Sequence, residues 1–145
     1  MQAILPNTDV SSVRYDDGKL YIAGSKDIYA SGNANPAFVG SMALNGGMLG
    51  TSFQQTFIPG KVATDVTSFG SKYYAVSGTS GVLAQLNKSN QLVEFSIPLN
   101  DLRALGYNDN KIVALSGTDG VKVYSTNGLN IIASFNTNTD IANAK

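Results

Sequence analysis

The most constraining feature of this sequence is an internal repeat, which recurs about every 36 to 39 residues. Residues 65–100 and 101–139 align closely with each other, and residues 9–64 align with them more loosely. Each copy contains an apolar run, a turn rich in Gly, Asn, Asp or Ser, and a second apolar run. A unit this short cannot bury its apolar face alone, so successive copies are expected to stack against one another.

The turns within the copies predict β-hairpins. They occupy residues 16–18, 70–71 and 107–110, where Gly, Asn and Asp tolerate the positive φ of tight hairpin turns. A second hairpin follows in each copy, so the predicted period is four antiparallel strands. No window has the 3.6-residue apolar period of an amphipathic helix, which predicts an all-β chain. The predicted strands cover residues 9–14, 19–24, 36–44, 51–58, 65–69, 72–78, 82–86, 92–97, 101–106, 111–117, 121–125 and 130–135.

The second strand of each copy favours β-propeller blades over a sandwich. Residues 20–23, 73–76 and 112–115 are apolar at consecutive positions, which is typical of strands buried on both faces. A two-layer sandwich leaves one face of each sheet in water, whereas radially stacked blades cover both faces of most sheets. We therefore predict propeller blades of four antiparallel strands.

The two ends of the chain resemble parts of further blades. Residues 4–10 match residues 97–102, and Asp140 restarts the repeat. Three blades are fewer than the four to eight that close a propeller, which predicts a fragment of a larger propeller or a chain that closes by self-association. The predicted organisation is a single propeller segment over residues 1–145, with the last strand of a preceding blade at 1–8, complete blades at 9–64, 65–100 and 101–139, a loop insertion at 25–35, and the start of a further blade at 140–145.

The third copy carries a family resemblance. The run from Lys111 to Val121, followed by Lys122-Val123-Tyr124-Ser125, resembles LVIVD and YVTN-type propeller blades of exported bacterial proteins, many of them surface lipoproteins. The resemblance covers residues 65–140 well and residues 9–60 loosely. It implies a propeller and an extracellular, cell-surface or periplasmic location, and it brings no catalytic residue. The chain has no Trp, so it departs from WD40 and quinoprotein blades.

Composition narrows the possible functions. The chain has no Cys and no His, so thiolate chemistry and the usual neutral-pH general base are missing. Ten basic residues balance ten acidic residues, which predicts no nucleic-acid partner. No run approaches the roughly 20 apolar residues of a membrane span, so we expect no membrane insertion by this segment. The Gly-x-x-Gly loops at residues 78–81 and 117–120 precede strands rather than helices, and we expect no cofactor and no metal.

A few polar residues are candidates for chemistry. The recurrent Asp9, Asp65, Asp101 and Asp140 would either form a cation-binding ring of carboxylates or cap their own loops, and capping is favoured. Two pairs of residues each have two possible roles. Arg14 and Arg103 would anchor an anionic ligand or pair with a neighbouring Asp, and Tyr73 and Tyr74 would stack on a sugar or pack between blades; ion pairing and packing are favoured.

The insertion at residues 25–35 is the one feature that the repeat does not require. Long loops often carry function, so we expect a partner-binding face built from Asp27, Tyr29, Asp65 and Asp101. The predicted function is a noncatalytic scaffold that binds a protein or a small polar ligand, in an exported or cell-surface protein. Two alternatives stay open: a propeller hydrolase or lyase whose site is completed by further blades, and a structural subunit that self-associates through exposed blade faces.

Overall fold

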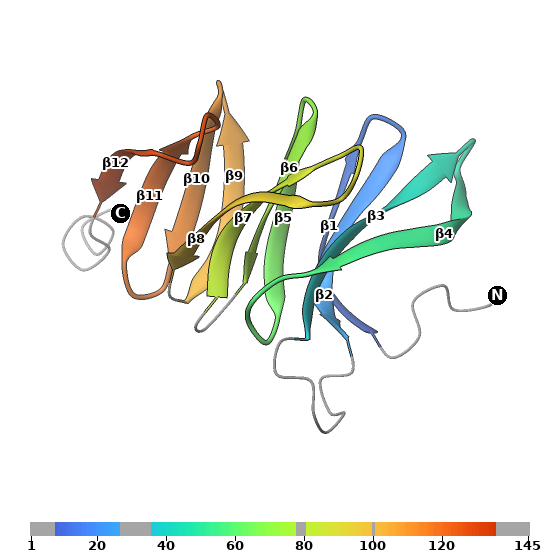
Figure 1. The fold of residues 1–145 in the computed structure, drawn as a ribbon, viewed down its shortest axis with the longest axis horizontal. Coiled ribbons are helices and arrows are strands. Elements are labelled where there is room, and N and C mark those ends of the chain that lie inside the picture. Colours follow the sequence, from blue (N-terminus) through green and yellow to red (C-terminus); the bar gives the residue numbers. More distant parts are fainter. Residues whose placement is uncertain (1–7, 27–35, 78–80, 100, 136–145) are drawn as a thin grey trace, which may run out of the picture.

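A computed structural model describes residues 8–26, 36–77, 81–99 and 101–135 (Figure 1). These residues form three sheets of four antiparallel strands, one sheet for each repeat, and no helix occurs in the described ranges. The all-β fold with four antiparallel strands per repeat is therefore confirmed. The strands are β1 (Thr8–Asp16), β2 (Lys19–Lys26), β3 (Ala37–Asn45) and β4 (Met48–Phe57) in the first sheet, β5 (Ala63–Phe69), β6 (Lys72–Ser77), β7 (Gly81–Asn87) and β8 (Val93–Leu99) in the second, and β9 (Leu102–Asn108), β10 (Lys111–Ser116), β11 (Gly120–Ser125) and β12 (Ile131–Phe135) in the third.

Turn chemistry fixes the hairpins as the sequence predicted. The turn between β1 and β2 has positive φ at Asp17 (47°) and Gly18 (71°), and the turn between β9 and β10 has positive φ at Asp109 (48°) and Asn110 (58°). Two consecutive left-handed residues suit the right-handed twist of the flanking strands. Within each sheet the strands follow chain order, so every neighbouring pair is a simple antiparallel hairpin.

The three sheets stack on one another in chain order (Figure 1). Strand β5 contacts β1, β2 and β3 of the first sheet, and β9 contacts β5, β6 and β7 of the second. The first strands of the second and third sheets therefore pack onto the face of the preceding sheet. The described residues make an open, blade-like stack of three sheets.

Each contact between sheets encloses its own apolar core. Tyr73 and Tyr74 are both buried, and because consecutive strand residues point to opposite faces, Tyr73 enters the core against the first sheet and Tyr74 the core against the third. The predicted packing role of this pair is confirmed. The first core contains Tyr21, Ala23, Ala37, Val39, Ile58, Ala63, Val66, Tyr73, Val82, Ala84 and Leu86, and the second contains Tyr74, Leu83, Leu102, Leu105, Ile112, Ala114, Tyr124 and Leu129.

Burial of the second strand on both faces holds in the first sheet but fails in the third. In β2, Tyr21, Ile22 and Ala23 are all buried. In β10, Ile112 and Ala114 are buried against the second sheet, whereas Leu115 is 37% exposed. Leu115 lies on the outer face of the third sheet, which no sheet among the described residues covers, whereas Ile22 is buried on the outer face of the first sheet although no described sheet covers that face either.

The antiparallel order gives the stack two distinct ends. The hairpin turns that follow the first and third strands of each sheet form the turn end, drawn at the top of Figure 1. The connections from second to third strands and from one sheet to the next form the loop end. The predicted last strand of a preceding blade at residues 1–8 lies outside the described residues except for Thr8, which belongs to β1, and the predicted start of a further blade at 140–145 lies wholly outside them.

Candidate functional site

The described part of the structure does not bring together the residues predicted to form a partner-binding face. Asp27 and Tyr29 lie outside the described residues. Asp65 is 6% exposed and belongs to the packing between the sheets, while Asp101 is partly exposed at the loop end. Asp65 and Asp101 therefore do not form a shared exposed surface, because only the Asp101 carboxylate faces solvent.

The Asp65 carboxylate links the first strands of all three sheets. Oδ1 accepts hydrogen bonds from the Ser12 hydroxyl of β1 at 2.5 Å and from the Val66 amide at 2.9 Å. Oδ2 accepts from the Leu105 amide of β9 at 2.8 Å, and Arg14 Nη2 lies 3.4 Å from Oδ1. Only the Val66 amide is a local donor, and the Ser12 hydroxyl and the Leu105 amide belong to other sheets, so the carboxylate bridges sheets rather than capping its own loop as the sequence favoured. Its acceptors are used inside the stack, so Asp65 does not lie on an exposed binding face as the sequence suggested.

Asp101 and Arg103 form an exposed ion pair at the loop end. Arg103 Nη2 lies 2.8 Å from Asp101 Oδ2, and the Arg103 side chain is 63% exposed. The carboxylate of Asp101 raises the pKa of the Arg103 guanidinium through this hydrogen bond. The Asp101 carbonyl accepts the Gly117 amide at 2.9 Å, and a Cβ on Gly117 would meet both members of the pair. The predicted pairing of both arginines with aspartates is confirmed.

A second polar centre, near the turn end, joins the first and second sheets. Asp16 Oδ2 accepts hydrogen bonds from Lys88 Nζ and from the Ser68 hydroxyl, each at 2.6 Å. Lys88 is nearly buried, and its ammonium also lies 5.2 Å from the centre of the Tyr21 ring. The hydrogen bond from Lys88 is the main reason why the pKa of Asp16 is lowered. The sequence marks Asp16 only as a turn residue, because no local pattern links it to a lysine in another repeat.

Gln91 completes the contact between these two sheets. Its Oε1 accepts the buried Tyr73 hydroxyl at 2.7 Å, its backbone carbonyl accepts the Thr56 hydroxyl at 2.6 Å, and its Nε2 donates to the Lys88 carbonyl at 2.9 Å. Burial raises the pKa of Tyr73, so the phenol stays a hydrogen-bond donor. This role could not be predicted from the sequence, since Gln91 lies in a polar turn.

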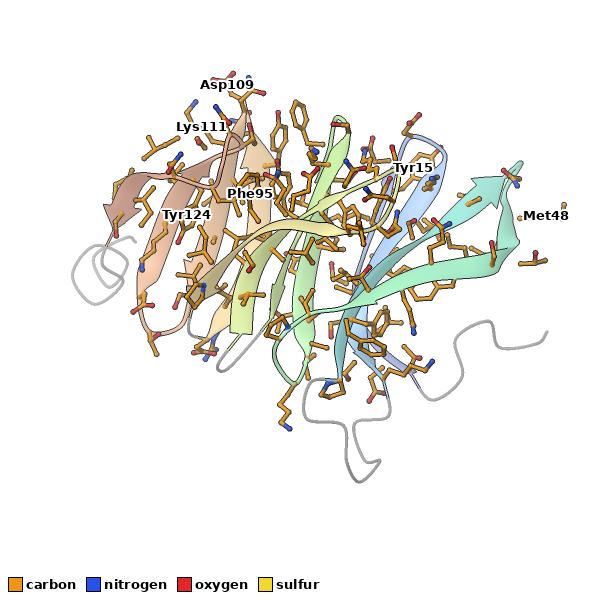
Figure 2. All side chains as sticks on the ribbon, viewed as in Figure 1. Tyr15, Met48, Phe95, Asp109, Lys111 and Tyr124 are labelled. Carbon is orange, nitrogen blue, oxygen red and sulfur yellow. The ribbon has the colours of Figure 1, made fainter. Side chains whose placement is uncertain are left out.

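Most of the acidic side chains in the described ranges lie in ion pairs with basic residues. Six carboxylates in the described ranges lie in ion pairs, and one such pair, Asp109 with Lys111, is visible at the turn end in Figure 2. The pKa of Glu94 falls to about 2, chiefly through its hydrogen bond with Lys72, so this carboxyl is not a proton donor at neutral pH. Burial raises the pKa of Tyr74 to about 12, which removes it as a base. No three His, Cys, Asp or Glu residues within the described part of the chain are grouped to hold a metal ion.

Comparisons with known proteins give information on the fold but not on the family of this chain. No protein-family profile matches the chain, and no curated protein matches it. Among solved structures, a computationally designed protein, Ika4, is similar with a TM-score of 0.64 over 88% of this chain and 72% of the designed chain. The two sequences are 9% identical, so this likeness concerns the fold alone. Within the ranges that the structure describes, no helix is long and apolar enough to cross a membrane.

Proposed function

We propose that this chain is a noncatalytic binding scaffold made of propeller-type blades. The proposal is based on the structural contacts that the carboxylates make. The Asp65 and Asp16 carboxylates hold sheets together. The Glu94 carboxylate accepts hydrogen bonds from Lys72, Gln85 and Asn87 within one sheet. Active sites usually need carboxyls or phenols whose pKa lies near neutrality. The shifts found here move carboxyl and tyrosine pKa values away from neutrality.

Propeller blades are supported by the way the sheets stack. In propellers, four-stranded antiparallel sheets follow one another around an axis. Here each sheet is one repeat, and β1, β5 and β9 are successive neighbours. Binding residues in such folds sit on loops that a rigid scaffold positions.

The loop end is the proposed contact face for a protein or a small polar ligand. Its exposed polar groups in the described part include Arg103, Asp101, Thr118 and Asp119. A planar guanidinium that is already held by one carboxylate offers further donors in a fixed direction, which suits carboxylates and backbone carbonyls of a partner. The contribution of Asp27 and Tyr29 remains a prediction from the sequence. So does the exported or cell-surface location, which depends on the resemblance to LVIVD and YVTN-type blades.

A direct test pairs a binding selection with an activity screen. Random twelve-residue peptides displayed on phage are selected against the immobilised chain, and their affinities are compared between Arg103→Ala and the control Asn127→Ala, which lies at the opposite end. We expect about tenfold weaker binding for Arg103→Ala, as for the loss of an interface anchor, and no change for the control. Equal affinities for the two variants would contradict binding at the loop end.

The activity screen addresses the enzyme alternative. The chain is incubated with p-nitrophenyl glycosides, esters and phosphates, and no release of nitrophenol above the buffer rate is expected. Turnover that disappears in Asp101→Asn, while the fold persists by circular dichroism, would overturn the noncatalytic proposal and favour a hydrolase.

A further inference from the structure

Strand β1 exposes apolar side chains that its counterparts in the other sheets bury. Val10, Val13 and Tyr15 are 48%, 44% and 65% exposed, and Figure 2 shows Tyr15 near the turn that ends β1. Their cross-strand partners in β2 are Gly24, Ile22 and Leu20. They therefore share the face of the first sheet that points away from the second sheet, since Tyr21 and Ala23 occupy the other face.

The register of the hairpins identifies the counterparts. Val13 in β1, Val66 in β5 and Leu105 in β9 occupy the same position in their sheets. Their cross-strand partners in the second strands are Ile22, Ala75 and Ala114, respectively. Val66 is fully buried, and Leu105 is 8% exposed, in each case within the core shared with the preceding sheet.

The flanking positions behave in the same way. Ala63 and Leu102, the counterparts of Val10, are 0% and 1% exposed. At the position of Tyr15, the third sheet has Tyr107, which stacks on Phe69 of the preceding sheet with ring centres 4.1 Å apart, and the second sheet has Ser68, whose hydroxyl donates to Asp16 of the first sheet. Strand β1 therefore has the side chains that pack on a preceding sheet, but it has no such sheet among the described residues.

The third sheet presents the matching surface. Val113 pairs with Val123, and Leu115 pairs with Val121, so all four lie on the outer face of this sheet. Phe135, opposite Val121, adds a side chain that is 49% exposed. The counterparts of this face in the first two sheets are buried under the sheet that follows: Tyr21, Ala23 and Val39 in the first, and Tyr74 and Leu83 in the second.

We infer that two copies of this chain associate head to tail, with β1 of each copy packed on the outer face of the third sheet of the other. This contact would repeat the two contacts between sheets that the chain already makes, so the inference depends on the proposed blade arrangement. The number of copies follows from ring size. Propellers close with four to eight blades, and one, two or three copies would supply three, six or nine sheets, of which only six falls in that range. When head-to-tail contacts close on themselves they form a ring, and two copies would form a ring with two-fold symmetry.

The chemistry of the two faces favours apolar association. Ala104 of β9 is at the position that Asp65 occupies in β5, because their partners Leu115 and Val76 are equivalent. The third sheet therefore has a methyl group where the second sheet has the carboxylate that links the sheets. The new contact would bury valine, leucine and tyrosine side chains without opposing charges. Association should therefore depend little on salt concentration, because few ion pairs would be screened.

The first experiment measures the mass of the full chain by sedimentation equilibrium from about 1 to 100 µM. We expect twice the chain mass of 15.2 kDa, unchanged between 0.05 and 0.5 M salt. Val13→Asp and Leu115→Asp should each give monomers, because both interfaces of the ring contain each residue. Leu92→Asp, at an exposed apolar position just before β8 of the second sheet, should remain dimeric and serves as the matched control. Circular dichroism verifies the fold of every variant, and Tyr15→Asp replaces Val13→Asp if the latter fails to fold.

Mixing the variants distinguishes the possible geometries. A head-to-tail pair of Val13→Asp with Leu115→Asp retains one unmodified interface, so the mixture should form a dimer although neither variant does so alone. A dimer of Val13→Asp by itself would show third sheets pairing with each other and would overturn the inference. A monomeric wild type, or assemblies that grow with concentration, would also overturn it. None of these results bears on peptide binding at the loop end, so the proposed function is tested separately.

Discussion

Replacing Asp65 by alanine should destabilise the stack more than any other loss of a single charge. The substitution removes the acceptors of two backbone amides, Val66 and Leu105, and of the Ser12 hydroxyl. A buried donor left without an acceptor costs about 1–3 kcal/mol, so the expected loss is about 3–5 kcal/mol. This is a large share of the roughly 5–15 kcal/mol that a domain of this kind has available. The Arg14 pair adds little, because that side chain is 51% exposed and its contact is 3.4 Å long.

Urea unfolding monitored by circular dichroism measures this loss. We expect Asp65→Asn, which keeps one carbonyl oxygen, to lose about half as much free energy of unfolding as Asp65→Ala, and Arg14→Ala to lose less than about 1 kcal/mol. A loss below about 1 kcal/mol in Asp65→Ala would refute the hydrogen-bond argument. So would equal losses in Asp65→Ala and Arg14→Ala, since the ion pair would then dominate.

Three further predictions address other parts of the stack. Gly40→Ala should destabilise by about 1–3 kcal/mol in urea unfolding, because a Cβ there meets the Gln54 carbonyl and the Phe53 ring; an unchanged midpoint would contradict this packing. The Glu94 carboxyl should titrate near pH 2 by NMR and move towards 4.5 in Lys72→Met; because the pKa is lowered in the folded state, the stability it contributes is present above pH 4.5 and is lost as pH falls towards 2. Tyr124→Phe should unfold at the same or a higher urea concentration, because the buried hydroxyl has no hydrogen-bond partner among the described residues; a large loss would show that the hydroxyl is satisfied in solution.

The strand pattern was accessible from sequence because it depends on local chemistry. Positive-φ residues such as Gly18 and Asn110 mark the hairpin turns, and apolar runs on either side mark the strands. Strand ends moved by one to a few residues, as at β4, which begins at Met48 because Gly46 and Gly47 already complete the turn. The opposite roles of Tyr73 and Tyr74 also followed from local alternation.

The polar links between sheets could not be predicted, because they join residues far apart in the chain. Lys88 reaches Asp16 across the first contact between sheets, and nothing near either residue specifies the other. Asp65 was identified as a recurrent aspartate, but its burial depends on where the Leu105 amide of the next repeat falls. The half-exposed outer face of β10 depends on the absence of a covering sheet in the described stack, which the apolar pattern of residues 112–115 does not report.

The most direct test of the account is a set of NOE contacts between the sheets of the chain in solution, because the account requires two separate cores that share the second sheet. Methyl groups of Val66 should show contacts to the Tyr21 ring, and methyl groups of Leu105 should show contacts to the Tyr74 ring. Val13→Asp and Leu115→Asp protein should give the same contacts, because both substitutions lie outside these cores. Contacts between Leu105 and Tyr21, or amide contacts that pair β5 with β9 as one continuous sheet, would contradict the stack of blade-like sheets.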